Sequence, residues 1–268
     1  MDEVKNNTTV VLKRMDKPIL IIPDVHGRDF WKKPVMDFLE KEEGKIIFLG
    51  DYLDPYLYEF EGTGMTDDEI RKKTIDTFKE IIELKKANFD RVVLLLGNHD
   101  LGYFIDKDIC EVRRDYFNYN IIRDLFDDNF DLFQLADEVY LNGKHIIFSH
   151  AGINKDYAKF VFGDKVNDEN VVELFNNTYY QDKIEKLQML GYYSRYRGLW
   201  GGRFGSIVWA DLREWFDNSG NEAYGFNVVG HTQIIEPLIT EKFAFLDCHK
   251  AFVLNMDGNI VEWKEENN

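Results

Sequence analysis

The sequence predicts an α/β protein with four layers, α/β/β/α, in which two sheets pack against each other between outer helices. Three observations support this prediction. Strand and helix signals alternate through the first half, short strands return in the last third, and residues 153–204 are helical in pattern and rich in aromatic side chains. We interpret residues 1–268 as one domain with a helical cap inserted at about 153–204.

The first half of the chain alternates between strand and helix patterns. Continuous apolar runs at Pro18–Ile22, Lys45–Leu49 and Arg91–Leu96 are typical of strands that are buried on both faces. Phe30–Lys41 has apolar residues at helical spacing, and Thr66 with Glu69 has the pattern of a capping box that opens a helix extending to about residue 87. This order predicts parallel strands with helices on the faces of the sheet.

The second half returns to strands after a helical, charge-rich stretch from about Asp106 to Asp131. Strands around Glu138–Leu141 and His145–Ser149 are joined at Asn142-Gly143, a dipeptide that predicts a β-hairpin. We expect the remaining strands at Ser206–Trp209, Phe226–Val229, Phe243–Leu246, Ala251–Asn255 and Ile260–Trp263.

The charge balance argues against a nucleic-acid-binding protein. Asp and Glu outnumber Lys and Arg by 49 to 33, so the formal net charge is −16 and the surface field repels phosphate backbones. The longest apolar runs are too short to span a bilayer, and the polar first residues lack the apolar stretch of a signal peptide. We therefore expect a cytoplasmic protein without a nucleic-acid or membrane partner; the oligomeric state is left open.

Residues of metal-ligand type follow five of the predicted strands. They are Asp24 and His26, Asp51, Asn98 and His99, His150, and His231. Each has an ordinary interpretation by itself, as a helix cap or a turn residue. Because loops at the carboxyl ends of strands meet in one crevice of an α/β sheet, their recurrence in this position predicts one shared site. Carboxylate, amide and imidazole ligands suit Mn²⁺, Fe or Zn²⁺, and the absence of thiolates argues against a structural zinc site.

The ordered motifs resemble those of the calcineurin-like metallophosphoesterases, and within that superfamily the serine/threonine phosphoprotein phosphatase branch. The resemblance extends from residue 18 to about 255 and rests on Asp24-Val25-His26-Gly27, Gly50-Asp51-Tyr52-Leu53-Asp54, Gly97-Asn98-His99-Asp100, Ser149-His150-Ala151-Gly152 and Gly230-His231-Thr232. It implies a dinuclear metal-dependent phosphatase with two divalent ions, Mn first and Fe or Zn as alternatives. The reaction it implies is hydrolysis of a phosphomonoester by in-line attack of a hydroxide that bridges the metals.

The resemblance also implies a role for each residue. Asp51 would bridge the metals, with Asp24 and His26 completing the first site and Asn98, His150 and His231 the second. His99 would protonate the leaving group as general acid, with Asp54 behind it as the residue that orients the ring. Asp100 is the rival for that orienting role.

Two departures from the branch put a protein substrate in doubt. Pro55 stands where the branch has an arginine that binds substrate phosphate, and the loop from Tyr52 to Thr66 is longer than usual. Arg213 is the substitute that we predict, with the alternatives Arg28, Arg195, Arg197 and Arg203. Pro23 precedes Asp24 in place of the usual glycine, which a strand end tolerates. Gln233 stands where many phosphodiesterases of the superfamily have a second histidine, and this indicates the phosphatase branch.

The predicted substrate is a phosphoprotein or a small phosphorylated molecule. A dinucleoside polyphosphate or a phosphodiester is the alternative substrate for the same fold. A non-catalytic scaffold is the alternative from another class, and the presence of every proposed ligand together with His99 argues against it.

Overall fold

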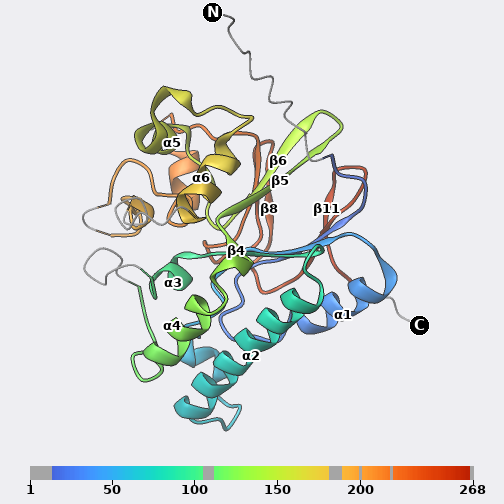
Figure 1. Ribbon diagram of the computed structural model, residues 1–268, viewed down its shortest axis with the longest axis vertical. Helices are drawn as coiled ribbons and strands as arrows, with labels where there is room; N and C mark the ends of the chain where they lie inside the picture. Colours follow the sequence, from blue (N-terminus) through green and yellow to red (C-terminus); the bar gives the residue numbers. More distant parts are fainter. Residues whose placement is uncertain (1–13, 105–111, 181–188, 199–200, 218–219, 266–268) are drawn as a thin grey trace, which may run out of the picture.

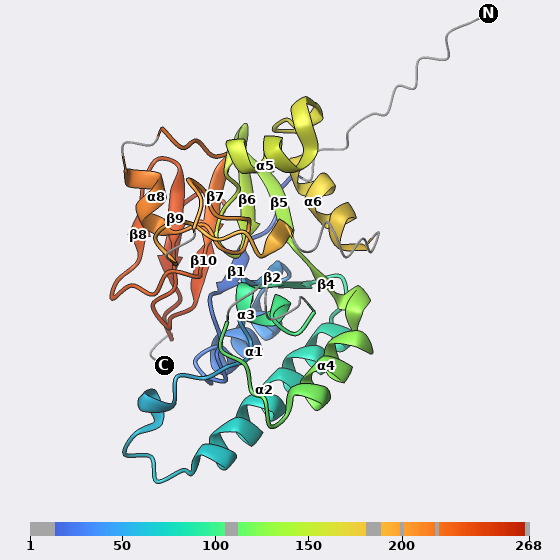
Figure 2. The same cartoon turned by 90° about the vertical axis from the view of Figure 1, so that its left-hand side faces the viewer.

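The computed structural model describes residues 14–104, 112–180, 189–198, 201–217 and 220–265. It contains two sheets packed face to face, with helices on their outer sides (Figures 1 and 2). The first sheet has the strand order β11-β10-β1-β2-β3-β4 and the second the order β5-β6-β7-β9-β8. The predicted four-layer α/β/β/α class is therefore confirmed.

In the first sheet, β1 to β4 run parallel to one another. At its other edge β10 pairs antiparallel with β1, and β11 pairs antiparallel with β10. Its strands are β1 (Ile19–Ile22), β2 (Lys45–Phe48), β3 (Val92–Leu95), β4 (Phe133–Gln134), β10 (Phe252–Leu254) and β11 (Ile260–Glu262). Ile19 pairs with Lys45, and Ile46 pairs with Val92, which sets the register of the three central strands. The predicted parallel order of the first half is confirmed.

Helices α1 (Lys32–Lys41), α2 (Asp67–Ala87) and α4 (Tyr119–Asp127) lie on the outer side of the first sheet (Figure 2). Their apolar side chains, among them Phe38 and Phe78, join one buried cluster with the strands. The capping box of α2 forms as predicted. The hydroxyl oxygen of Thr66 accepts the backbone N–H of Glu69 (3.3 Å), and the backbone N–H of Thr66 donates to the carboxylate of Glu69 (2.8 Å). The 3₁₀ turns Leu57–Phe60 and Phe130–Leu132 belong to this half as well.

The second sheet begins with the predicted hairpin. Strands β5 (Ala136–Leu141) and β6 (Lys144–Ser149) pair antiparallel, and Asn142 and Gly143 between them both have positive φ, 52° and 79°. Two positive φ values are what a type I′ turn requires. The remaining strands are β7 (Phe226–Val229), β8 (Leu238–Ile239) and β9 (Phe243–Phe245), of which β7 and β9 run parallel to β6. Side chains from both sheets, such as Ile47 and Phe148, form the core between them.

Residues 153–204 supply helices α5 (Lys155–Phe162) and α6 (Val171–Tyr180), and the 3₁₀ turn Gly163–Lys165. The side chain of Asn176 in α6 accepts the backbone N–H groups of Leu135 and Ala136 (2.9 and 3.1 Å) and donates to the carbonyl of Ala136 (2.9 Å). Helix α6 is thereby joined to the start of β5. A cap formed by residues 153–204 stays a prediction.

Three details differ from the prediction. Ser206–Trp209 is a turn and not a strand, because the backbone N–H groups of Trp209 and Ala210 both donate to the carbonyl of Ser206 (2.9 Å each). A short buried apolar run does not by itself distinguish a strand from a buried turn. Strands β4 and β8 were not predicted because each has only two residues. The expected helical stretch from Asp106 forms as α4 from Tyr119, and residues 105–111 lie outside the described residues.

The described residues also include the short helices α3 (Asn98–Leu101) and α8 (Leu212–Phe216). Within the described part of the chain, every helix is too short or too polar to cross a membrane.

Candidate metal centre

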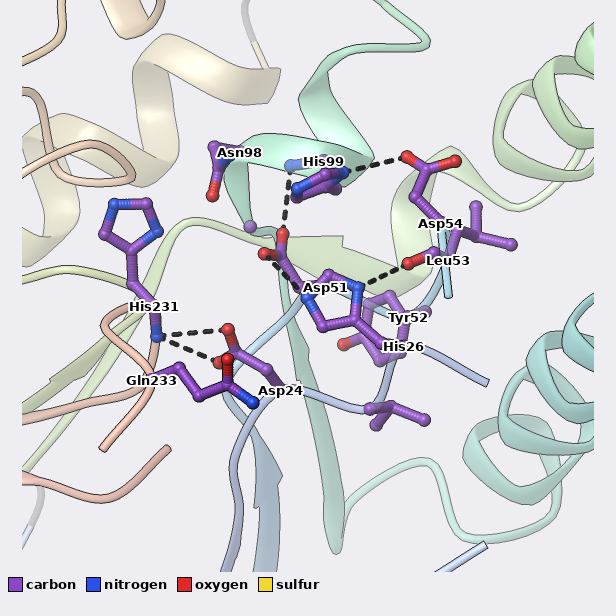
Figure 3. A network of polar contacts seen from close by, with 12 residues as sticks. Asp24, His26, Asp51, Tyr52, Leu53, Asp54, Asn98, His99, His231 and Gln233 are labelled. Atoms are coloured by element: carbon purple, nitrogen blue, oxygen red, sulfur yellow. Dashed lines mark hydrogen bonds and ion pairs between the residues drawn. The ribbon is translucent and has the colours of Figure 1, made fainter. Parts of the chain in front are cut away.

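The polar residues predicted from strand ends come together between the two sheets. Asp24 and His26 follow β1, Asp51 follows β2, and Asn98 and His99 open α3 directly after β3; His150 follows β6, and His231 follows β7. All seven side chains are buried (Figure 3 shows all but His150). The carboxyl ends of strands from both sheets therefore contribute to one site, as is general for open α/β sheets.

The backbone around this site adopts a sparsely populated conformation. His26, Asp51, Asp54 and His231 have φ values of 44°, 52°, 57° and 63°, in the left-handed region that non-glycine residues seldom occupy. Such residues cost free energy and persist where the surrounding structure fixes them, which is common at functional sites. The strain therefore marks the same residues as the sequence motifs.

Two groups of possible metal ligands share Asp51. The first contains His26, Asp51 and His99, and the second Asp51, His150 and His231; within each group one ligand atom per residue lies within 4.8 Å of the others. Oδ1 of Asn98 lies 3.0 Å from Nε2 of His150 and so belongs beside the second group. A carboxylate common to two groups is the arrangement that a bridging ligand requires.

The hydrogen bonds of the histidines fit a bound cation. Nδ1 of His150 donates to the carbonyl of Leu49 (2.8 Å), and Nδ1 of His26 donates to the carbonyl of Leu53 (2.6 Å), since a carbonyl can only accept. In a neutral ring Nε2 then presents its lone pair to the site. Nε2 of His231 is buried and has no hydrogen-bond partner among the described residues. Convergent acceptors of this kind form a site in which a cation can bind.

The carboxylates create an electrostatic problem that a cation would solve. Burial, reinforced by the charge of Asp51, raises the pKa of Asp24 to about 7 against the opposing effect of His150. Burial also acts to raise the pKa of Asp51, but His150 and His99 outweigh it and hold that pKa well below the usual range. Burial lowers the pKa of His26 to about 3. Divalent ions would stabilise both carboxylates as anions and the histidines as neutral ligands.

His99 contacts Asp54 and not Asp100. Nδ1 of His99 lies 3.0 Å from Oδ2 of Asp54, as Figure 3 shows. Asp100 instead accepts backbone N–H groups from Asp51 (2.7 Å), Gly97 (2.8 Å) and Tyr52 (3.1 Å). Asp100 therefore holds the two loops that carry Asp51 and Asn98, while Asp54 is placed to orient the ring of His99.

A cavity of about 210 Å³ opens above these residues. Its floor contains five residues of the site, and its walls are Tyr56, Val112, Arg113, Arg197 and Trp209. Two arginines thus line a cavity whose floor consists of possible metal ligands. They supply local positive charge in a protein with a net charge of −16.

Arg213, the phosphate-binding residue predicted from the sequence, does not line this cavity. Its guanidinium donates to Asp211 (2.8 and 3.1 Å) and to the carbonyl of Tyr196 (2.7 Å), and its side chain is 58% exposed. Of the alternatives, Arg28 pairs with Glu59, Arg195 with Asp217 and Arg203 with Asp156.

Arg197 is the one of the predicted alternatives that does line the cavity. Its Nε lies 2.7 Å from Oδ2 of Asp211, and its Nη2 donates to the hydroxyl of Thr232 (2.7 Å), directly after His231. These contacts hold the guanidinium beside the second group of metal ligands.

Arg113 was missed by the sequence interpretation. Its two Nη groups donate to the carbonyls of Asp54 and Pro55 (2.9 Å each), and its guanidinium lies over the ring of Tyr56 at 3.9 Å. The guanidinium therefore lies against Pro55, which stands at the position where the phosphatase branch has an arginine. The only signal in the sequence was the pair of adjacent arginines 113 and 114 in a charge-rich segment. The sequence does not reveal that this segment contacts the site, because the contact forms only in the folded protein.

Asp247 was also missed. It lies two residues after β9, beside the end of β7, and its buried Oδ1 has no hydrogen-bond partner among the described residues. Burial, reinforced by the charge of Asp24, raises the pKa of Asp247 well above its usual range. The signal in the sequence was the same as for the other site residues, an aspartate that directly follows a predicted strand.

Comparison with known proteins gives one family match. The family model of the calcineurin-like phosphoesterases matches residues 17–247. No curated protein sequence matches the chain.

Two solved structures with a TM-score of 0.53 share this fold, and a third is similar at a lower score. A cold-active protein-tyrosine phosphatase of the psychrophile Shewanella sp. is similar, with a TM-score of 0.53, 17% identity, and coverage of 94% of this chain and 82% of that one. A second structure of a cold-active protein tyrosine phosphatase has a TM-score of 0.53 and 16% identity over 95% and 80%. A protein serine/threonine phosphatase from Saccharomyces cerevisiae has a TM-score of 0.48 and 13% identity over 98% and 83%.

Proposed function

The chain belongs to the calcineurin-like phosphoesterase family, and we propose that it is a metal-dependent phosphatase that hydrolyses a phosphomonoester. The observation that carries this proposal is the pair of buried ligand groups that share Asp51, with His99 and two arginines around the same cavity. Neutral imidazoles, carboxylates and an amide oxygen form a donor set suited to Mn²⁺, Fe or Zn²⁺, of which we propose Mn²⁺.

The metal-holding residues divide into two sets. Asp24, His26 and Asp51 would hold the first ion, and Asp51, Asn98, His150 and His231 the second. When bound, two such ions lower the pKa of water and neutralise charge on a phosphoryl group. The chain holds these ligands with backbone contacts, such as the N–H of His99 that donates to Oδ1 of Asp51 (2.9 Å).

His99 is proposed as the general acid. Its Nδ1 faces Asp54, so its Nε2 is available to carry a proton toward the cavity. As the bond between phosphorus and the leaving oxygen breaks, that oxygen would take the proton from Nε2, leaving an alcohol and a neutral imidazole. His99 also lies in the first group of possible ligands, so metal binding by a His99 variant decides between the two roles.

Arg113 and Arg197 are proposed to bind the substrate phosphate, in place of Arg213. Both line the cavity, and both are held by two or more contacts, so little side-chain freedom would be lost on binding. Arg113 lies beside the His99 side of the cavity, and Arg197 lies beside His231. A phosphoryl group between them would meet a guanidinium from each side.

The size of the cavity supports a monoester. At about 210 Å³ it is smaller than the roughly 300–1,000 Å³ of pockets that enclose whole ligands. It would enclose the phosphoryl group and the first atoms of the leaving group, with the rest of a phosphoprotein or a small molecule outside. Cytoplasmic location and the absence of nucleic-acid and membrane partners remain expectations.

One panel of substrates tests the proposal. Protein reconstituted with Mn²⁺ would be assayed on an alkyl phosphomonoester, an aryl phosphodiester, a phosphopeptide and a dinucleoside tetraphosphate, with the metal content measured in parallel. We expect turnover of the monoester or the phosphopeptide to exceed that of the other two. Preference for the diester or the dinucleotide by orders of magnitude would overturn the monoester proposal. Failure of the purified protein to bind Mn²⁺ would instead favour a scaffold without catalysis.

A further inference from the structure

The carboxylate of Asp54 is held by more than His99. Its Oδ2 faces Nδ1 of His99 at 3.0 Å, while its Oδ1 accepts the hydroxyl of Tyr103 (2.7 Å) and the backbone N–H of Asp115 (3.1 Å). The same N–H also donates to the hydroxyl oxygen of Tyr103 (3.0 Å), so the three groups form one network. All four residues are buried, and Tyr103 is only 1% exposed. Both oxygens of this carboxylate are therefore engaged inside the protein.

Tyr103 is placed by the same turn of chain as His99. It lies four residues after His99, immediately beyond α3, and its backbone N–H donates to the carbonyl of Asp100 (3.1 Å). Side chains four residues apart lie on the same side of a helical turn. The hydroxyl of Tyr103 and the ring of His99 thus approach Asp54 together, from one short segment.

Neighbouring aromatic rings restrict the rotamer of Tyr103. Its ring lies 5.5 Å from the ring of Tyr119 and is stacked 6.1 Å from that of Phe126, both in α4. Close packing around a buried ring restricts it to one rotamer. Helix α4 therefore determines where the hydroxyl of Tyr103 lies.

The second donor to Asp54 is held just as firmly. The carboxylate of Asp115 accepts the backbone N–H groups of Phe117 (3.1 Å) and Asn118 (3.2 Å), and it lies 3.3 Å from Nη1 of Arg71 in α2. The N–H of Asp115 that donates to Asp54 thus belongs to a turn anchored to both α2 and α4.

A buried hydroxyl that merely satisfies its hydrogen-bonding needs could donate to any nearby carbonyl, as the hydroxyl of Tyr157 does to that of Met189 (2.9 Å). Tyr103 instead donates to the carboxylate that contacts the proposed acid. With Oδ1 fixed by two donors, the carboxylate cannot rotate about its own axis, and Oδ2 stays directed at Nδ1 of His99. The direction of Nε2 toward the cavity follows from that contact.

We propose that Tyr103 is a positioning residue that aims His99 at the leaving-group oxygen by holding Asp54. This inference rests on the proposed acid role of His99. Removing the hydroxyl leaves Oδ1 with one donor and lets the carboxylate and the imidazole reorient together. Proton transfer depends steeply on such geometry, whereas substrate binding does not use it.

The test compares two substrates of Tyr103→Phe loaded with Mn²⁺. Glycerol 2-phosphate has a poor leaving group that needs a proton, and 4-nitrophenyl phosphate has an activated one that does not. We expect kcat on glycerol 2-phosphate to fall about tenfold or more, a part of the roughly 10²–10⁴-fold that general acid catalysis contributes. On 4-nitrophenyl phosphate we expect a change of less than about twofold, with KM constant for both.

Tyr157→Phe is the matched control, since it removes a buried hydroxyl whose partner is the carbonyl of Met189, and neither residue lines the cavity. It should leave the ratio of the two rates unchanged, even where it lowers the melting temperature as much as Tyr103→Phe does. An equal loss on both substrates in Tyr103→Phe would show a structural role only and overturn the inference.

A double-mutant cycle gives the second measurement. In an Asp54→Asn background, Tyr103→Phe should cause little further loss on glycerol 2-phosphate, because the residue through which it acts is already changed. Additive losses would contradict the inference. His99→Asn distinguishes failure of the acid role from failure of the positioning role. If the loss of kcat in His99→Asn is the same for both leaving groups, the acid role of His99 fails. If that loss depends on the leaving group in His99→Asn and not in Tyr103→Phe, only the positioning role of Tyr103 fails.

Discussion

The carboxylate of Asp24 accepts the backbone N–H of His231 through both oxygens, at 3.0 and 3.1 Å, although the residues lie 207 positions apart. Asp24 follows β1 in the first sheet, and His231 follows β7 in the second. One contact thus joins the two sheets and aligns two proposed metal ligands. The chain leaves no space for a side chain beside it, because a Cβ added at Gly230 would collide with Oδ1 of Asp24.

Gly230→Ala should therefore weaken both folding and metal binding. The added methyl group must displace Asp24 or β7, at a cost of about 1–3 kcal/mol in the free energy of unfolding. We expect a lower melting temperature and a smaller rise of that temperature on addition of Mn²⁺. Gly143→Ala is the control: it strains a positive φ in the hairpin turn but should keep the full response to Mn²⁺. An undiminished metal response in Gly230→Ala would contradict this account of the contact.

His99→Asn should separate metal binding from proton transfer. If His99 acts as the acid, the variant keeps two metal ions per chain and loses about 10²-fold or more in kcat on an alkyl phosphate. Metal content measured by elemental analysis, together with kcat on the same preparation, checks both parts. Loss of one metal ion would identify His99 as a ligand, and unchanged turnover on the alkyl phosphate would rule out the acid role.

The three arginines near Asp211 and Asp54 should differ in their effect on substrate binding. Arg113→Lys and Arg197→Lys each replace a planar guanidinium that lines the cavity, and we expect KM and the inhibition constant of inorganic phosphate to rise about tenfold. Arg213→Lys is the matched control outside the cavity and should change both by less than about twofold. A larger effect at position 213 than at 113 and 197 would restore the assignment predicted from the sequence.

Glu214 should make stability fall as the pH rises through the weakly acidic range. It is fully buried, Gly205 donates its backbone N–H to it (3.0 Å), and burial raises its pKa from 4.5 to about 7. Between these two values the unfolded chain has lost the proton and the native protein retains it, so increasing pH favours unfolding. Below 4.5 both states are protonated, and above about 7 both are ionised, so the dependence ends there.

Glu214→Gln removes this titration while keeping the size of the side chain. Thermal melts of both proteins between pH 4.5 and 7 check the prediction. The wild type should lose stability relative to the variant across this window. Parallel curves for the two proteins would show that Glu214 is ionised in the native state throughout.

Local patterns were sufficient for most of the fold. The strands at β1, β2 and β3 are short runs of apolar residues buried on both faces, and the start of α2 is specified by Thr66 and Glu69 within four residues. The run from Ser206 to Trp209 has similar composition but folds as a turn, because its burial comes from packing and not from pairing with another strand. Composition indicates that such a run is buried and does not indicate what surrounds it.

The sequence by itself determined the metal-ligand types and their positions at strand ends, because the order of strands along the chain already predicts that those ends meet. Only the tertiary structure decided which arginines face the cavity and which groups hold Asp54. Arg113 contacts carbonyls 58 and 59 positions away, and Tyr103 contacts a carboxylate 49 positions away. No periodicity or local motif encodes such contacts, since they depend on how α3, α4 and the loop after β2 pack together.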